Sequence, residues 1–251
     1  MSRAKTIQEV LEQLDLIIED SINENSRLGL FAYVYRRTTA EIASEIDKGR
    51  FEDNPRMEKM DVAFANLYLD AYKAYKNDAH LSASWAFAFD HAKEPLTILQ
   101  HIMLGMNAHI NLDLGIATAA TMTGKNITAI ESDFNKVNDI LFQITNELQE
   151  RLGRVSPLMF LLDWFGQNKD EKVIDFSMRK AREQSWNSAN LIWSIGPDQH
   201  TNTINAIDQV VLKIAERIQS PRTRTVRFLL KLMRNFETKQ VNKIITKLKA
   251  N

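Results

Sequence analysis

Cysteine is absent from this 251-residue chain, and glycine and proline are scarce, with 8 and 5 residues respectively. The absence of cysteine excludes disulfide bonds, thiolate metal sites and a cysteine nucleophile. Glycine and proline supply most tight turns, and a β-rich fold of this length usually needs more of them. The shortage of both residues therefore favours helices over sheets.

Excess charge and long apolar runs are missing as well. Lys plus Arg and Asp plus Glu both total 32, so the formal net charge is zero. We therefore expect no global electrostatic attraction to nucleic acid. The longest apolar runs fall well short of the ~18 residues of a membrane-spanning helix, and residues 1–9 carry no signal-peptide pattern. Together these absences predict a cytoplasmic protein.

Apolar residues recur at helical spacing along most of the chain, whereas period-two alternation never persists beyond a few residues. Glycine, proline or asparagine interrupts the helical pattern at intervals. No internal repeat or low-complexity linker divides the chain. The sequence therefore predicts an all-α, single-domain, multi-helix bundle over residues 1–251, built around a buried central helix at about residues 94–120. One short apolar helix is expected at residues 157–166.

The predicted central helix is apolar on every side, which is typical of a helix enclosed by others. It nevertheless carries five polar residues within thirteen positions: His101, Asn107, His109, Asn111 and Asp113. Buried polar groups cost free energy unless they find partners. This stretch is therefore either a satisfied polar network or a functional site.

Helix geometry separates these polar residues into groups. His109 and Asp113 are four residues apart, about 6 Å along the axis, and can share one ion or one proton. His101 lies roughly 12 Å from His109, too far for one metal ion to bridge them easily. Asn107 and Asn111 lie together on another side. His109 and Asp113 are thus candidate catalytic residues or metal ligands, or simply a core pair, and the two Asn are candidate substrate donors.

Residues 105–114 read GMNAHINLDL. This segment resembles the signature Gly-x-Asn-Ala-His-Ile-Asn-x-Asp-Leu of a bacterial protein family of unknown function. The likeness extends over roughly residues 28–195, through weaker blocks at Tyr35-Arg36-Arg37-Thr38-Thr39, Gly49-Arg50-Phe51, Arg56, Asp61, Phe64-Ala65-Asn66, Tyr68, Asp133-Phe134, Arg182 and Trp186. The resemblance implies a helical bacterial protein and brings no established activity.

Asp61 and Tyr68 share one largely apolar face of a helix that is expected to begin at Pro55. An inward Asp61 facing His109 and Asp113 would complete a group suited to Zn, Mn or Fe. The alternative is a surface Asp near the start of its helix, where negative charge suits the helix dipole. Both interpretations stay open.

Three arginines are candidates for binding a carboxylate or phosphate on a ligand. Arg36 and Arg37 are adjacent in an apolar helix, so one of them is expected to point inward, and Arg182 lies on a later helix. The favoured interpretation is that an inward Arg pairs with a buried Asp, and ligand binding is the alternative. Asn66 and Tyr68 complete the set of candidate substrate-binding residues.

The end of the chain differs from the rest. Residues 221–251 hold nine Lys or Arg and one acid, Glu237, which gives a net charge of +8. Its apolar residues also lie at helical spacing. Such helices either cap a bundle with their charges in water or contact an anionic membrane surface or nucleic acid. We favour the cap.

Several catalytic motifs are missing from the sequence: E-x-x-H, H-E-x-x-H, the Walker A loop, G-x-S-x-G and the dinucleotide-binding glycine pattern. The leading hypothesis is a small-molecule enzyme with a buried His/Asn/Asp site. Metal-assisted hydrolysis or a related acid–base reaction fits it best, with a divalent transition metal as the candidate cofactor. The alternative is a non-catalytic helical protein that binds an apolar ligand or a protein partner.

Overall fold

The computed structural model describes residues 2–158 and 173–250, and every regular element within these ranges is helical. This confirms the all-α prediction. Short 3₁₀ turns at His91–Lys93 and Ile127–Ile130 and a π-helical turn at His109–Asp113 accompany the α-helices. The α-helices are α1 (Ile7–Asn23), α2 (Leu28–Asp47), α3 (Asn54–Lys76), α4 (Ala83–Asp90), α5 (Ile98–Ala108), α6 (Leu114–Thr121), α7 (Glu131–Val155), α9 (Val173–Ser194), α10 (Pro197–Gln219), α11 (Arg224–Phe236) and α12 (Val241–Lys249). Most of the short helix expected at residues 157–166 lies outside the described residues.

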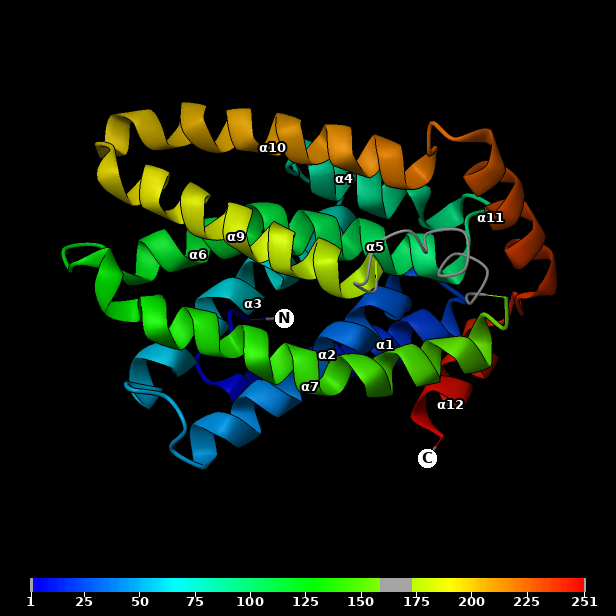
Figure 1. The fold of residues 1–251 in the computed structure, drawn as a ribbon, viewed down its shortest axis with the longest axis horizontal. Coiled ribbons are helices and arrows are strands. Elements are labelled where there is room, and N and C mark those ends of the chain that lie inside the picture. Colours follow the sequence, from blue (N-terminus) through cyan, green and yellow to red (C-terminus); the bar gives the residue numbers. More distant parts are fainter. Residues whose placement is uncertain (1, 159–172, 251) are drawn as a thin grey trace.

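The helices form a layered bundle with the central segment inside it. Figure 1 shows α4 and α10 along one side, α5, α6 and α9 in the middle, and α1, α2, α3 and α7 on the other side. The continuous segment α5, π turn and α6 contacts α2, α3, α4, α9 and α10. An enclosed position agrees with its lack of a polar face, and the predicted burial of the central helix is confirmed.

Two local features of the central segment differ from the prediction. It begins at Ile98 rather than at residue 94, because Thr97 and Gln100 form a capping box that satisfies the first backbone N–H groups. It is also not one uninterrupted α-helix. The π-helical turn at His109–Asp113 separates α5 from α6, and the N–H of Leu114 bonds to the carbonyl of His109.

Small residues let neighbouring helices approach this segment closely. A Cβ atom on Gly105 would lie 2.4 Å from Cγ of Phe31 in α2. A Cβ atom on Gly115 would lie 3.0 Å from Cβ of Ser188 and 3.2 Å from the carbonyl oxygen of Ser185, both in α9. These two glycines therefore set the spacing of α2 and α9 from the centre of the bundle.

The basic C-terminal helices pack on one end of the bundle. Their inward faces are apolar, with Leu229, Leu230 and Met233 of α11 and Val241, Ile244, Ile245 and Leu248 of α12 buried. The Glu237 carboxylate between them accepts hydrogen bonds from the N–H of Ile98 at 2.8 Å and from Ser156 Oγ at 2.6 Å. These contacts fix the end of the chain to the start of α5 and the end of α7.

Within the described residues, no helix combines the length and the apolar character needed to cross a membrane.

Candidate functional site

His109 stands at the start of the π-helical turn, inside a cluster of aromatic rings. Phe64 stacks on the imidazole with ring centroids 3.6 Å apart and planes within 6°. The Tyr35 ring meets it edge-on at 4.3 Å. Three more rings lie within 6.1 Å of it: Phe31, Tyr68 and Trp85. Only 2% of His109 is exposed, so its ring nitrogens depend on protein or ligand atoms for hydrogen bonds.

Asp113 holds one side of this imidazole. Asp113 Oδ2 lies 3.0 Å from His109 Nδ1 and accepts a hydrogen bond from Trp85 Nε1–H at 2.9 Å. The predicted contact between the two residues is therefore confirmed. Trp85, on α4, fixes the carboxyl, and the carboxyl fixes the orientation of the ring. Because π-helical turns occur frequently at functional sites, the backbone itself also marks this position.

Burial disfavours the charged forms of both His109 and Asp113. It lowers the pKa of His109 well below its usual value and raises the pKa of Asp113 well above its usual range, and the Trp85 hydrogen bond only partly opposes the second shift. Both shifts favour the uncharged forms of the two groups. With Asp113 uncharged, its hydroxyl donates to His109 Nδ1 and the ring proton lies on Nε2, whereas with Asp113 ionised the ring donates from Nδ1 to the carboxylate.

His109 lines a small cavity, here called the inner cavity, together with two other buried ionisable groups. The cavity has a volume of about 80 Å³, and its walls include Asp61 of α3 and Arg182 of α9. Neither His109 Nε2 nor Asp61 Oδ2 has a hydrogen-bond partner among the described residues. Buried polar atoms are nearly always paired. These two atoms are therefore the strongest indication of a ligand site.

The other two ionisable groups at the inner cavity have shifted pKa values. Burial raises the pKa of Asp61 to about 7, Glu58 adds to the rise, and the positive charge of Arg182 opposes it. Burial lowers the pKa of Arg182 to about 10, and Asp61 opposes that shift. Asp61 therefore changes its protonation state near neutral pH, while Arg182 stays charged. No ion pair joins the two side chains.

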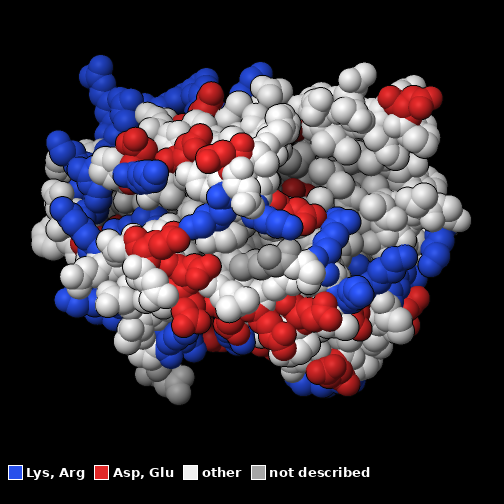
Figure 2. Space-filling view, turned by 180° about the vertical axis from the view of Figure 1, so that it is seen from behind, with Lys and Arg blue, Asp and Glu red and all other residues white. Residues whose placement is uncertain are grey.

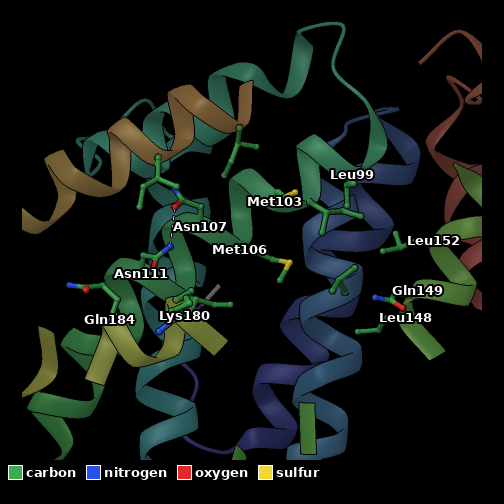
Figure 3. Close-up of a pocket in the computed structure, with 16 residues that line it drawn as sticks. Leu99, Met103, Met106, Asn107, Asn111, Leu148, Gln149, Leu152, Lys180 and Gln184 are labelled. Carbon is green, nitrogen blue, oxygen red and sulfur yellow. Dashed lines mark hydrogen bonds between the residues drawn. The ribbon is translucent and has the colours of Figure 1, made fainter. Parts of the chain in front are cut away.

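A second and larger space adjoins the inner cavity. This apolar cleft has a volume of about 400 Å³, and Val34, Met106 and Ile110 line both it and the inner cavity. Figure 3 shows Met103 and Met106 in its middle, with Leu99, Leu148, Gln149 and Leu152 on one side and Asn107, Asn111, Lys180 and Gln184 on the other. Its size is that of a typical small-molecule site.

The two predicted asparagines form the polar part of this cleft. Asn107 Nδ2 donates to the carbonyl of Val211 at 3.0 Å, and Asn111 Nδ2 donates to Asn107 Oδ1, also at 3.0 Å. Asn111 Oδ1 accepts no hydrogen bond from a described residue. Asn107 and Asn111 thus lie together, as predicted, but in the cleft and not beside His109.

The predicted metal group is not formed. Among residues 2–158 and 173–250, no three His, Asp or Glu side chains come close enough to hold a metal ion together. His109 and Asp113 are hydrogen-bonded to each other, whereas Asp61 lines the inner cavity and makes no hydrogen bond to either of them. Asp61 is buried, as one of the two interpretations required, with 7% exposed.

Arg36 and Arg37 lie away from the cavities, and the expectation that one of them points inward is wrong. Arg36 pairs with Asp15 at 2.9 Å, and its side chain is 36% exposed. The Arg37 side chain, 27% exposed, pairs with Glu41 at 2.9 Å and with Glu147 at 2.8 Å. Arg36 pairs with a carboxylate on α1 and Arg37 with one on α7, so neither side chain needs a partner in the core.

Asn66 and Tyr68 are buried, but only one of them lies near His109. Asn66 exchanges two hydrogen bonds of 2.9 Å with the backbone of Ala4 and so fastens the N-terminal segment. Tyr68 is fully buried against the aromatic cluster, and its hydroxyl has no hydrogen-bond partner among the described residues. Its burial raises its pKa well above the usual value.

His101 is buried as predicted, with 7% exposed, and lies apart from the inner cavity. Burial lowers its pKa to about 3, with further lowering from the charges of Arg27 and His91, whereas a hydrogen bond to the Leu96 backbone opposes the shift. It is uncharged and bonded to the backbone just before α5. This placement agrees with a structural role.

Two of the outer sequence blocks meet at α7. Asp133, fully buried, accepts hydrogen bonds from the N–H groups of residues 52 and 53 and from Arg56 Nη2 at 2.8 Å. Arg182 donates to the carbonyl of Phe134 at 2.8 Å and lies 4.5 Å above its ring. It also bonds to Asn138. These contacts hold Arg182 in place beside the inner cavity.

Sequence reasoning missed several residues that shape the site. Trp85 was not singled out, although a buried tryptophan N–H needs a partner. Tyr35 and Thr39 line the inner cavity, and Met103 and Met106 line the cleft. Apart from the family resemblance of the block at residues 35–39, no local pattern in the sequence distinguishes these residues from ordinary core residues.

The model of a family of unknown function (DUF5995) matches residues 7–221, which is most of the chain. No curated protein and no solved structure shows a significant match. The matched range includes residues 105–114 and the blocks between residues 28 and 195, so the predicted membership of a family of unknown function is confirmed. The chain belongs to the DUF5995 family.

Proposed function

We propose that this protein is a small-molecule enzyme in which Asp61 and His109 move protons on a ligand held in the inner cavity. The observation that carries the proposal is the pair of buried atoms without partners, His109 Nε2 and Asp61 Oδ2, at one cavity. Each leaves a hydrogen bond unmade, at a cost of about 1–3 kcal/mol. A ligand that bonds to both atoms recovers this free energy.

The two groups have opposite roles in proton transfer. Asp61, with its pKa raised to about 7, is the base, because an efficient general base has a pKa near the working pH. With Asp113 uncharged, His109 carries its proton on Nε2 and is the donor, oriented by Asp113 and Trp85. Groups whose environments push their pKa values apart are the usual acid and base of an active site. Hydrolysis belongs to this class of reaction: Asp61 takes a proton from the attacking water, and His109 gives its Nε2 proton to the leaving group while Nδ1 takes the proton of the Asp113 hydroxyl, which leaves a neutral imidazole and an Asp113 carboxylate.

The inner cavity and the apolar cleft accommodate two different parts of one ligand. The inner cavity, about 80 Å³ in volume, has room for a small polar group or a few water molecules. The apolar cleft holds the larger part of the ligand. Met106 lines both spaces, and its unbranched side chain is the kind that can reorient. The substrate is thus a mainly apolar molecule with one reactive polar end, and Asn111 Oδ1 is an acceptor for a second polar group.

A second function has one observation in its favour. The cleft is lined mostly by aliphatic side chains and methionines, which suits a carrier that binds an apolar molecule without changing it. In that case Asp61 and His109 do not touch the ligand.

A fragment screen on the whole protein by ligand-observed NMR separates the two functions. The library combines apolar bodies with carbonyl, ester, amide or hydroxyl ends. The proposal expects hits that lose binding in His109→Gln and in Asp61→Asn, and also in Met103→Trp, which fills the cleft. His101→Gln is the matched control, because it changes a buried histidine outside both cavities. Hits that survive both inner-cavity substitutions but not Met103→Trp identify a carrier and refute the enzyme.

A further inference from the structure

The outward face of α11 combines exposed aromatic rings with exposed cations. Phe228 is 65% exposed and Phe236 is 63% exposed, among the largest exposures of any apolar side chain described. Leu232, between them, is partly exposed. At 100° per residue these three residues form one stripe along the helix. The opposite face of α11 packs on the bundle, so this stripe is not needed for the core.

The helix that carries the stripe is rich in exposed cations and has no acid of its own. Arg224, Arg227 and Lys231 are exposed on the same side of α11, and none of them forms an ion pair with a described residue. No Asp or Glu occurs from residue 217 to 236, and the next acid, Glu237, is buried. In Figure 2, turned by 180° from Figure 1, Lys and Arg side chains gather on the left, where α11 lies in that view.

We propose that this face of α11 binds the surface of an anionic phospholipid bilayer. The cations fit lipid phosphate and carboxylate groups, and the Phe228–Leu232–Phe236 stripe enters the boundary between headgroups and acyl chains, as in interfacial amphipathic helices. A continuous apolar stripe beside the cations favours a bilayer over nucleic acid, because a bilayer offers an apolar phase along the whole helix. The surface is independent of the function proposed for the inner cavity.

Sedimentation with vesicles tests this surface on the full chain. Phosphatidylcholine vesicles with roughly 30% phosphatidylserine are compared with pure phosphatidylcholine vesicles, at low and at high salt. We expect binding to the mixed vesicles alone, weakened by salt. The triple variant Arg224→Gln/Arg227→Gln/Lys231→Gln is expected to bind on the order of 100-fold more weakly, because each basic residue near an anionic surface contributes about fivefold. This variant leaves the packed face of α11 unchanged.

The aromatic stripe is tested separately. Phe228→Ser/Phe236→Ser is expected to reduce binding to the mixed vesicles, whereas the control Phe142→Ser/Lys213→Gln, which changes an exposed ring on α7 and an exposed cation on α10, retains it. Equal loss in the control variant contradicts the proposal, as does equal binding to both kinds of vesicle. Binding to single- or double-stranded DNA without binding to vesicles assigns the face to nucleic acid. If the parent protein self-associates without binding vesicles, and Phe228→Ser/Phe236→Ser no longer self-associates, the face binds a second copy of the chain.

Discussion

Gly105→Ala tests the packing around His109 through a single methyl group. The new Cβ atom would lie 2.4 Å from Cγ of Phe31 and 2.8 Å from its Cβ and Cδ1. The Phe31 ring cannot turn aside freely, because it packs against the rings of Tyr35, Tyr68 and Trp85 and against the imidazole of His109. Alanine also favours the helical backbone of α5 by about 1 kcal/mol relative to glycine. Forcing a methyl group into a filled core costs typically about 1–3 kcal/mol.

The clash outweighs the helix preference, since it includes Cβ of Phe31, which moves only with the α2 backbone. We expect Gly105→Ala to lower the free energy of unfolding by about 1–2 kcal/mol. Gly153→Ala is the matched control, because it is also helical and a Cβ atom there meets nothing within 4 Å. That substitution is expected to raise stability by about 0.5–1 kcal/mol. Urea denaturation of both variants measures the difference, and equal stabilisation of the two would refute the packing of Phe31 on Gly105.

Three further substitutions test the ionisable groups and their partners. Burial raises the pKa of Asp61 from 3.8 to about 7, so the folded chain holds a proton that the unfolded chain releases between these pH values, and stability falls as pH rises through this window and then stays constant. Urea denaturation measures the free energy of unfolding of Asp61→Asn relative to that of the parent. This difference should rise by about 2–3 kcal/mol in favour of Asp61→Asn between pH 5 and pH 8, and a pH-independent difference would contradict the assigned pKa. Trp85→Phe removes the N–H that bonds Asp113 and should cost about 1–3 kcal/mol; calorimetry showing an unchanged melting temperature would argue against that bond. Glu237→Gln weakens the acceptor at the N–H of Ile98 and should lower stability by about 1 kcal/mol, and faster hydrogen exchange at that amide would locate the effect.

Much of the helical framework was predictable because its signals are local. Pro55 lies in the first turn of α3, and the apolar surface all round residues 98–121 requires other helices on every side. The contact between His109 and Asp113 also followed from four-residue spacing alone. In each of these cases the deciding interaction lies within one helix or follows from its composition.

The rest depended on contacts between helices that no sequence pattern specifies. The π-helical turn shifts the residues after His109 relative to a regular α-helix, so angles based on 100° per residue no longer apply beyond it. Asp61 and Arg182 meet at the inner cavity although their helices are far apart in sequence. Arg36 and Arg37 form ion pairs with carboxylates on α1 and α7, and these pairs depend on where the two helices lie in the fold.

Nitrogen-15 NMR of the histidine side chains tests the central claim about the inner cavity most directly. The account predicts that His109 gains no proton near the ordinary histidine pKa, because burial lowers its pKa well below that value, and that its proton lies on Nε2 with Nδ1 as the acceptor. It also predicts that the Nε2 signal shifts as Asp61 titrates near pH 7 and that this shift is absent in Asp61→Asn. An imidazole that gains a proton near its ordinary pKa, or that carries its single proton on Nδ1 at every pH, would contradict the assignment of His109 as the proton donor.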